Sequence, residues 1–250
     1  MKKLLIAAVA LAAAPFAASA DGGWAGSGEL GFAASRGNAK SENLNAKLNF
    51  SKEDDVWKNT FYLTALRSKG NTTTIETVNG VPSAVTRYDY TANRYEAGAS
   101  AGYKFDERSY LVGALRYEND DFSPFTYQAV FSLGYGYTAI KNERTELSFE
   151  IGPGYKRYEP VLTGETESDI VGRGLVTYRH RLSENTTFEN IFLVEAGADN
   201  KFYQNDAGLV VNMNKTLALK LGYQVRHNTD VAPGIKKTDQ LMTTNLVYNF

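Results

Sequence analysis

Apolar and polar side chains alternate along most of the chain. The clearest example is residues 41–51, where Leu44, Leu48 and Phe50 share one face and Lys47 lies on the other. A period of two is that of a β-strand, because a helix would scatter the same apolar residues around its circumference. The alternation therefore predicts strands that each have an apolar and a polar face.

Twelve such segments follow one another, and an even number of strands is typical of single-chain bacterial outer-membrane barrels. The last segment carries Leu246, Tyr248 and Phe250 on one face, which resembles the C-terminal signal read by the barrel-assembly machinery. The predicted fold is all-β, an antiparallel transmembrane β-barrel of about twelve strands. The predicted strands are residues 24–35, 41–51, 56–67, 90–105, 110–118, 126–140, 146–158, 170–182, 187–197, 203–212, 217–227 and 240–250.

The connections between these strands sort by parity. When the connections are numbered from the first strand onward, the even-numbered ones are short. The odd-numbered ones include long loops at 68–89, 159–169 and 228–239. Outer-membrane barrels have short periplasmic turns and longer external loops, so the parity predicts that both termini are periplasmic. Aromatic residues near both ends of the strands, Tyr110 and Phe202 among them, predict two belts at the membrane interfaces.

Residues 1–20 have the pattern of a secretory signal peptide, which leaves residues 21–250 as the barrel domain. Two lysines precede a short apolar stretch, and small residues lead up to Ala20, after which we expect cleavage. The expected location is the bacterial outer membrane. The chain has no Cys, which excludes disulfides and thiolate sites, and its formal net charge of −1 gives no support to nucleic-acid binding.

Alternation alone does not decide which face of the barrel is inside. A soluble periplasmic calyx that binds a small ligand would enclose the apolar face, whereas a membrane barrel turns that face to lipid. The signal peptide, the turn parity and the terminal Phe250 favour lipid outside. Charges enclosed in the lumen must then be paired or hydrated. The predicted lumen-facing charges are Lys47, Lys58, Arg94, Glu96, Lys104, Arg116, Glu118, Glu150, Lys156, Arg173, Arg179, Arg181, Glu189, Glu195, Asp206, Lys220 and Arg226.

Arg173, Arg179 and Arg181 fall on one predicted lumen-facing row. Arginines aligned along a pore wall can select anions. Glu189 and Glu195 on the next strand instead favour an internal lattice of salt bridges, because charges of opposite sign then lie on adjacent strands. Both interpretations stay open, with the lattice slightly favoured.

The chain offers little catalytic chemistry. An outer-membrane lipid hydrolase is the enzyme alternative, with His227 as the general base. The other histidine, His180, falls on the lipid-facing side. No local motif supplies a nucleophile and an orienting acid. Residues 119–121 lack the spacing of a calcium loop. We therefore predict no enzyme, metal or cofactor. The expected partners are outer-membrane lipid and lipopolysaccharide, whose phosphates Lys236 and Lys237 could meet.

Several segments resemble a family of uncharacterised, YdiY-like, salt-induced outer membrane proteins. The resemblance runs from about residue 28 to residue 250 and implies an outer-membrane β-barrel, but no substrate and no catalytic residue. We therefore expect a small channel or an envelope protein related to salt or osmotic stress. The segments that carry the resemblance are 31–38, 92–95, 152–155, 221–228 followed by 233–239, and 246–250.

Overall fold

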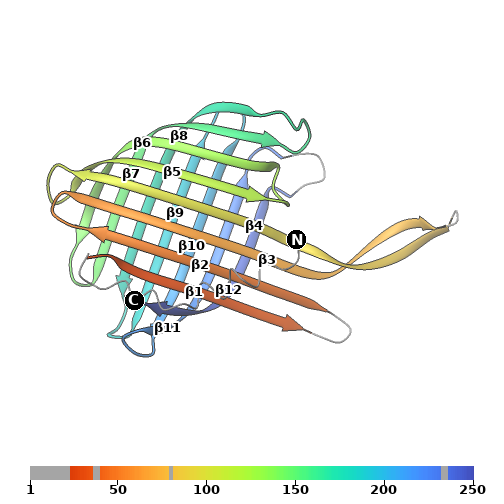
Figure 1. The fold of residues 1–250 in the computed structure, drawn as a ribbon, viewed down its shortest axis with the longest axis horizontal. Coiled ribbons are helices and arrows are strands. Elements are labelled where there is room, and N and C mark those ends of the chain that lie inside the picture. Colours follow the sequence, from red (N-terminus) through yellow and green to blue (C-terminus); the bar gives the residue numbers. More distant parts are fainter. Residues whose placement is uncertain (1–22, 36–39, 79–80, 232–235) are drawn as a thin grey trace.

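The computed structural model is a closed antiparallel β-barrel of twelve strands (Figure 1). It describes residues 23–35, 40–78, 81–231 and 236–250, so the predicted signal peptide lies outside the described residues. The fold class predicted from the alternation is confirmed. The strands are β1 (Ala25–Ser35), β2 (Ser41–Glu53), β3 (Trp57–Val78), β4 (Val81–Lys104), β5 (Ser109–Asp120), β6 (Phe125–Lys141), β7 (Thr145–Pro160), β8 (Glu167–Arg181), β9 (Thr186–Ala196), β10 (Lys201–Asn212), β11 (Leu217–Asn228) and β12 (Thr238–Asn249).

Short turns at one end of the barrel repeat one hydrogen-bond pattern. In four of them an Asp or Asn side chain accepts from the backbone N–H groups two and three residues further on. The bond from Trp57 N–H is the main cause that lowers the pKa of the Asp54 carboxyl, and the bond from Arg108 N–H does the same for Asp106. Figure 1 shows these turns at the end where the carboxyl terminus lies. The four turn residues are Asp54, Asp106, Asn142 and Asn214.

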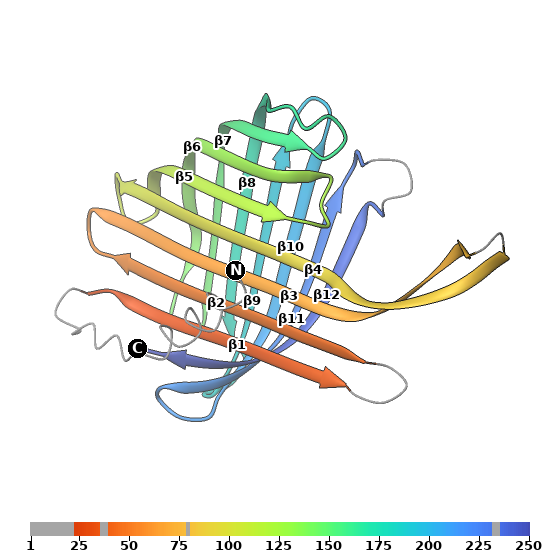
Figure 2. The ribbon, with the colours of Figure 1, turned by 45° about the vertical axis from the view of Figure 1, so that its right-hand side comes forward.

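The longest predicted loop, residues 68–89, is instead part of a regular hairpin, so that prediction is wrong. β3 and β4 stay paired as far as Val78 opposite Val81, with one register irregularity between Ser68 and Lys69. The outer part of the hairpin projects well beyond the other strands, at the right of Figures 1 and 2. Its many threonines have high strand propensity, which favours continued pairing over an irregular loop.

The outer face of the barrel is apolar and the inner face is largely polar. On β6, Phe131, Leu133 and Tyr135 are 50%, 51% and 48% exposed, whereas Ser132 and Thr138 on the other face are 4% and 6% exposed. A calyx that encloses its apolar face would have the opposite arrangement. No helix in the described ranges is long and apolar enough to cross a membrane.

Two aromatic residues depart from the predicted interfacial belts. Tyr110 and Phe202 lie inside the barrel, with 3% and 1% exposure, so their assignment to the belts is wrong. Gly102 and Gly136 leave room for the Tyr110 ring, because a Cβ at either position would clash with it. The Tyr110 hydroxyl donates to Glu150 Oε1 at 3.1 Å. A polar partner inside the lumen therefore accounts for the inward position of this tyrosine.

The last residue of the chain fixes the seam where β1 meets β12. Phe250 and Gly26 exchange two backbone hydrogen bonds of 3.0 and 2.9 Å. The Phe250 ring covers Gly26, where a Cβ would clash with it, and packs against Phe50 with ring centroids 5.8 Å apart. Leu246 and Tyr248 are 50% and 52% exposed on the outer face. The role of these three C-terminal residues as an assembly signal stays a prediction.

The close approach of β6 and β7 gives a test of the fold. A Cβ at Gly152 would clash with the carbonyl oxygen of Leu133 and the Cα of Gly134, which are backbone atoms and cannot turn aside. We expect Gly152→Ala to lower the free energy of unfolding by about 1–3 kcal/mol. Gly174→Ala is the matched control, because a Cβ there would have no atom of the described residues within 4 Å. Urea unfolding of the refolded barrel measures both, and equal stabilities would contradict the close approach.

Candidate functional site

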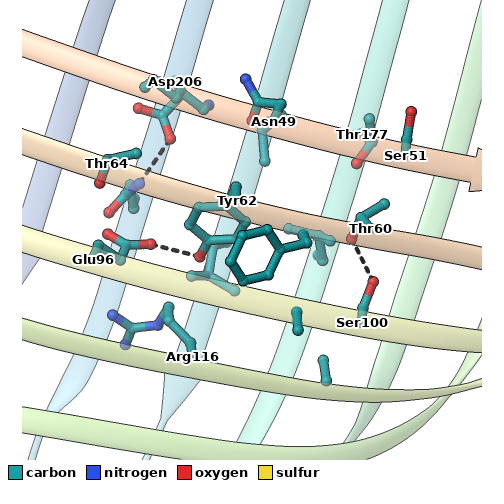
Figure 3. A pocket seen from close by; sticks show the side chains of 18 of the residues that line it. Asn49, Ser51, Thr60, Tyr62, Thr64, Glu96, Ser100, Arg116, Thr177 and Asp206 are labelled. Carbon is teal, nitrogen blue, oxygen red and sulfur yellow. Dashed lines mark hydrogen bonds between the residues drawn. The ribbon is translucent and has the colours of Figure 1, made fainter. Parts of the chain in front are cut away.

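The barrel encloses a cavity of about 590 Å³, which has room for roughly twenty water molecules at about 30 Å³ each. Its lining begins near the short turns with Glu53, Lys58 and Glu146 and ends deeper in the lumen at Arg116 and Glu195. Figure 3 shows part of this lining, with the hydroxyl groups of Ser51, Thr60, Ser100 and Thr177 at the right and the charged groups of Glu96, Arg116 and Asp206 further to the left. The cavity is therefore a vestibule that runs along part of the lumen.

The two sides of the vestibule differ in polarity. Leu175 of β8 and Ile191 and Leu193 of β9 line one side. Asn49 of β2 and Thr60 of β3 line the side opposite, because β8 and β9 lie across the barrel from β2 and β3. A solute in the vestibule would meet an apolar patch of three side chains on one side, next to Arg173, Thr177 and Glu195 of the same strands, and hydrogen-bonding groups on the other.

Positive and negative side chains are balanced around the vestibule. Among the described residues, seven cationic and seven acidic ones line it, so their charges sum to zero and favour neither sign of ion. The cationic residues are Lys47, Lys52, Lys58, Arg94, Arg116, Arg173 and Lys220, and the acidic ones are Glu29, Glu53, Glu96, Glu146, Glu150, Glu195 and Asp206.

Glu118 of β5 lies at the centre of a buried network beyond the deep end of the vestibule. Its side chain is 1% exposed and accepts hydrogen bonds from Arg116 Nη1 at 3.2 Å, Gln128 Nε2 at 3.0 Å and Arg226 Nη2 at 2.5 Å. β5 and β11 lie on opposite sides of the closed sheet. The ion pair between Glu118 and Arg226 therefore spans the lumen.

Arg116 extends this network to a third side of the barrel. Its Nε and Nη2 both donate to Glu195 of β9, the former at 3.0 Å. The centroid of the Phe202 ring of β10 lies 5.2 Å from the Arg116 Cζ and 5.0 Å from the Arg226 Cζ. Such cation–π contacts are strongest where the cation is desolvated. We call the set Arg116, Glu118, Gln128, Glu195, Phe202 and Arg226 the lumen plug.

A second chain of hydrogen bonds lies on the vestibule side of the lumen plug. Arg94 Nη2 of β4 donates to Gln224 Oε1 of β11 at 2.6 Å, and Gln224 Nε2 donates to Asp206 Oδ1 at 2.6 Å. Gln204 Nε2 donates to the other oxygen of Asp206 at 2.7 Å. These residues line the vestibule, whereas Glu118, Gln128, Phe202 and Arg226 do not. The vestibule therefore includes this second chain and ends at the lumen plug behind it.

The predicted arginine row does not form one continuous feature. Arg173 pairs with Glu150 at 3.0 Å rather than with Glu195, its partner in the strand register. Arg179 lies 3.7 Å from Glu189, and its side chain is 62% exposed. Arg181 is exposed at the end of β8. Of the predicted lumen charges, those that line the vestibule are Lys47, Lys58, Arg94, Glu96, Arg116, Glu150, Arg173, Glu195, Asp206 and Lys220.

Neutral side chains complete the site, and charge-based sequence analysis missed them. Gln128 donates to Glu118, Gln204 donates to Asp206, and Gln224 bridges Arg94 and Asp206. Tyr62 donates to Glu96 Oε1 at 2.6 Å (Figure 3). A sequence signal was present, because these amides fall on the same strand faces as the predicted charges. The partners of Gln128 and Gln224 lie on other strands, and strand alternation does not reveal such pairings.

Both histidines have threonine partners on neighbouring strands. His180 Nδ1 lies 2.8 Å from the Thr145 hydroxyl, and His227 Nδ1 lies 2.8 Å from the Thr238 hydroxyl. His180 also stacks on Tyr178, with ring centroids 6.2 Å apart. Within the described residues, no group of three or more His, Cys, Asp or Glu side chains is placed to hold a metal ion.

An antiparallel barrel with an apolar outer face and a polar, partly filled lumen defines a β-barrel of the membrane type. The chain belongs to the family described as "Protein of unknown function, DUF481", whose model matches residues 28–250. No curated protein matches the chain. The family assignment therefore supplies no activity.

Three solved structures are similar in fold. The NanC porin has a TM-score of 0.47 and 12% identity over 90% of this chain and 97% of that chain. The translocator domain of the autotransporter NalP from Neisseria meningitidis has a TM-score of 0.47 and 13% identity over 98% and 96%. An outer membrane channel from Pseudomonas putida F1 has a TM-score of 0.48 and 10% identity over 90% and 94%. Likeness at this level concerns the course of the chain alone, so the side chains of the lumen must carry any functional argument.

Burial predicts how much each carboxylate contributes to stability. We expect Glu118→Gln to lower the free energy of unfolding by about 3–5 kcal/mol, because two buried guanidinium groups lose a charged partner. Glu189→Gln should change it by less than about 1 kcal/mol, because its side chain is 35% exposed and its ion pairs are 3.5 and 3.7 Å long. Chemical unfolding compares the two variants, and similar losses would show that Glu118 is not a desolvated centre.

Proposed function

We propose that this protein is an outer-membrane channel of low conductance that the lumen plug holds closed. The observation that carries the proposal is the position of the vestibule, which begins near the short turns and ends at ion pairs that span the lumen. A solute could enter the vestibule but would have to displace buried ion pairs to leave it at the other end. The resemblance to salt-induced proteins suggests a role under osmotic stress.

The outer surface supports a place in the membrane. On β3, the outward side chains Trp57, Phe61 and Leu63 are 44%, 39% and 40% exposed. A strand crosses the hydrocarbon layer with about 9–11 residues, and an apolar band about 25 Å tall surrounds such barrels. Outer-membrane barrels have their short turns in the periplasm, so the vestibule would open to that side.

An arginine on the outer face tests the membrane placement. Leu133 lies outward on β6 and is 51% exposed. We expect Leu133→Arg to destabilise the barrel in lipid vesicles by about 2–4 kcal/mol, because the charge would lie in hydrocarbon. The control is Leu162→Arg, since Leu162 is 76% exposed in the connection between β7 and β8. Equal, small effects in both variants, within about 0.5 kcal/mol, would indicate a surface in water and contradict the proposal.

The lumen plug forms a barrier because its charges are desolvated. Arg116, Glu118, Glu195 and Arg226 are 6%, 1%, 2% and 6% exposed. Removing one partner from such a pair leaves an uncompensated buried charge, whereas removing both partners avoids that penalty. A charge-balanced double substitution is therefore the right way to open the lumen without unfolding the barrel.

Single-channel conductance in a planar bilayer tests the closure. We expect small or rare conductance from the wild type and a severalfold increase from Glu118→Ala/Arg226→Ala, because this pair spans the lumen. The control is Glu29→Ala/Lys220→Ala, which removes a 2.9 Å pair between strands on one side of the vestibule. The balanced lining predicts a reversal potential near zero under a salt gradient.

Silence from both folded double variants would contradict a channel. The protein would then be a closed envelope barrel, and its long external hairpin would be the surface to study. A large wild-type conductance that the double substitution does not change would show that the lumen plug is not the barrier.

A further inference from the structure

Cations and tyrosines alternate on the outer surface where β3 and β4 leave the barrel. Arg67 Cζ lies 4.3 Å and Lys69 Nζ lies 4.2 Å from the ring centroid of Tyr90. Lys69 Nζ is also 5.9 Å from the ring of Tyr88, and Lys40 Nζ is 4.1 Å from it. We call these five side chains the basic row. The row combines three cations with two aromatic rings.

The basic row faces outward and not into the lumen. Leu66 lines the vestibule and Ser68 is 8% exposed, so the residues that alternate with them on β3 point to the other face. Arg67 pairs in register with Leu44, and Leu44 pairs with Phe32, which is 69% exposed on the outer face. The row therefore lies directly beside the apolar outer surface.

The charges of the basic row lack acidic partners within the described residues. None of the ion pairs there involves Lys40, Arg67 or Lys69, although Glu42 is opposite Lys69 in the strand register. Arg67 and Lys69 approach the same ring, which holds two like charges close together. A bound anion would offset the repulsion between these cations.

The row lies at the depth where lipid headgroups are expected. The outward positions of β3 begin with Trp57 and are mostly apolar up to Ala65, after which Arg67 and Lys69 follow. A strand that enters the hydrocarbon at Trp57 and needs about 9–11 residues to cross leaves it near Arg67. Tyrosine is enriched at this interface. Basic groups beside a membrane surface attract anionic lipid headgroups.

We propose that the basic row binds the phosphate groups of an anionic lipid headgroup, that of the phosphorylated glycolipid in the outer leaflet. Lys40, Arg67 and Lys69 would supply the charge, and Tyr88 and Tyr90 hold two of these cations side by side. The proposal goes beyond channel function. It uses the membrane orientation proposed above but does not depend on an open lumen.

Native mass spectrometry of the full folded chain in detergent tests the site with diphosphorylated lipid A as the probe. We expect Lys40→Gln/Arg67→Gln/Lys69→Gln to weaken lipid A binding by at least about tenfold, since each surface cation contributes to headgroup attraction. The control variant is Arg108→Gln/Arg144→Gln/Lys215→Gln, which removes three exposed cations from the short turns. It should bind lipid A as the wild type does.

Further arms identify the ligand. Dephosphorylated lipid A should bind the wild type no better than it binds the triple variant. Millimolar inorganic phosphate should not displace lipid A; if it does, the site takes free anions and the lipid assignment is overturned. Equal weakening in both triple variants would indicate unspecific electrostatics, and unchanged binding in the basic-row variant would also overturn the proposal.

Lys69→Gln alone provides the test if the triple variant does not fold. Conductance should match the wild type in every variant, which separates this result from the channel proposal.

Discussion

Burial of the Glu118 carboxylate is the constraint on which the interior depends. A barrel of twelve strands encloses a space that opposite walls must share, and here Glu118 meets Arg226 from the far wall. A buried carboxylate needs charged and hydrogen-bonding partners, or its desolvation would be strongly unfavourable. Arg116 and Gln128 complete that set, and Arg116 in turn brings in Glu195. The walls of the barrel are thus tied together by contacts that no single hairpin contains.

The same contacts divide the lumen into two parts with different properties. On one side of the lumen plug, the vestibule has a volume of about 590 Å³. Hydroxyl groups, balanced charges and an apolar patch line it. Within the plug, Phe202 and two guanidinium groups fill the space that water could otherwise occupy. Neither a fully packed barrel nor a wide pore fits this arrangement. A closed channel does, because its resting state needs both a solvent-filled path and a barrier.

The sequence predicted the strands well and the lumen contacts poorly, for physical reasons. Alternation is a local property, so it gave the twelve strands and their two faces. The pairing of Arg116 with Glu195 depends on strands β5 and β9 facing each other across the lumen, which no local pattern records. Tyr110 and Phe202 were assigned to belts from position alone, although glycines and guanidinium groups draw them inside. The sequence predicts a loop at residues 68–89, where the structure has a hairpin, because the polar threonines of this segment obscure the apolar alternation.

The ion pairs of the lumen become less exposed from the short turns toward the lumen plug. This gradient favours entry of a solute from the end with the short turns. At that end Lys141 meets Glu53 at 2.7 Å, and the two side chains are 53% and 32% exposed. Pairs with such access to water contribute roughly 0–1 kcal/mol and exchange readily for solute contacts. At the lumen plug, Glu118 and Arg226 are 1% and 6% exposed, so separating them leaves charges that water does not reach. In the proposed channel, a solute that enters from the short turns would therefore displace weak pairs first and meet the strong ones last, so the lumen plug would limit its passage.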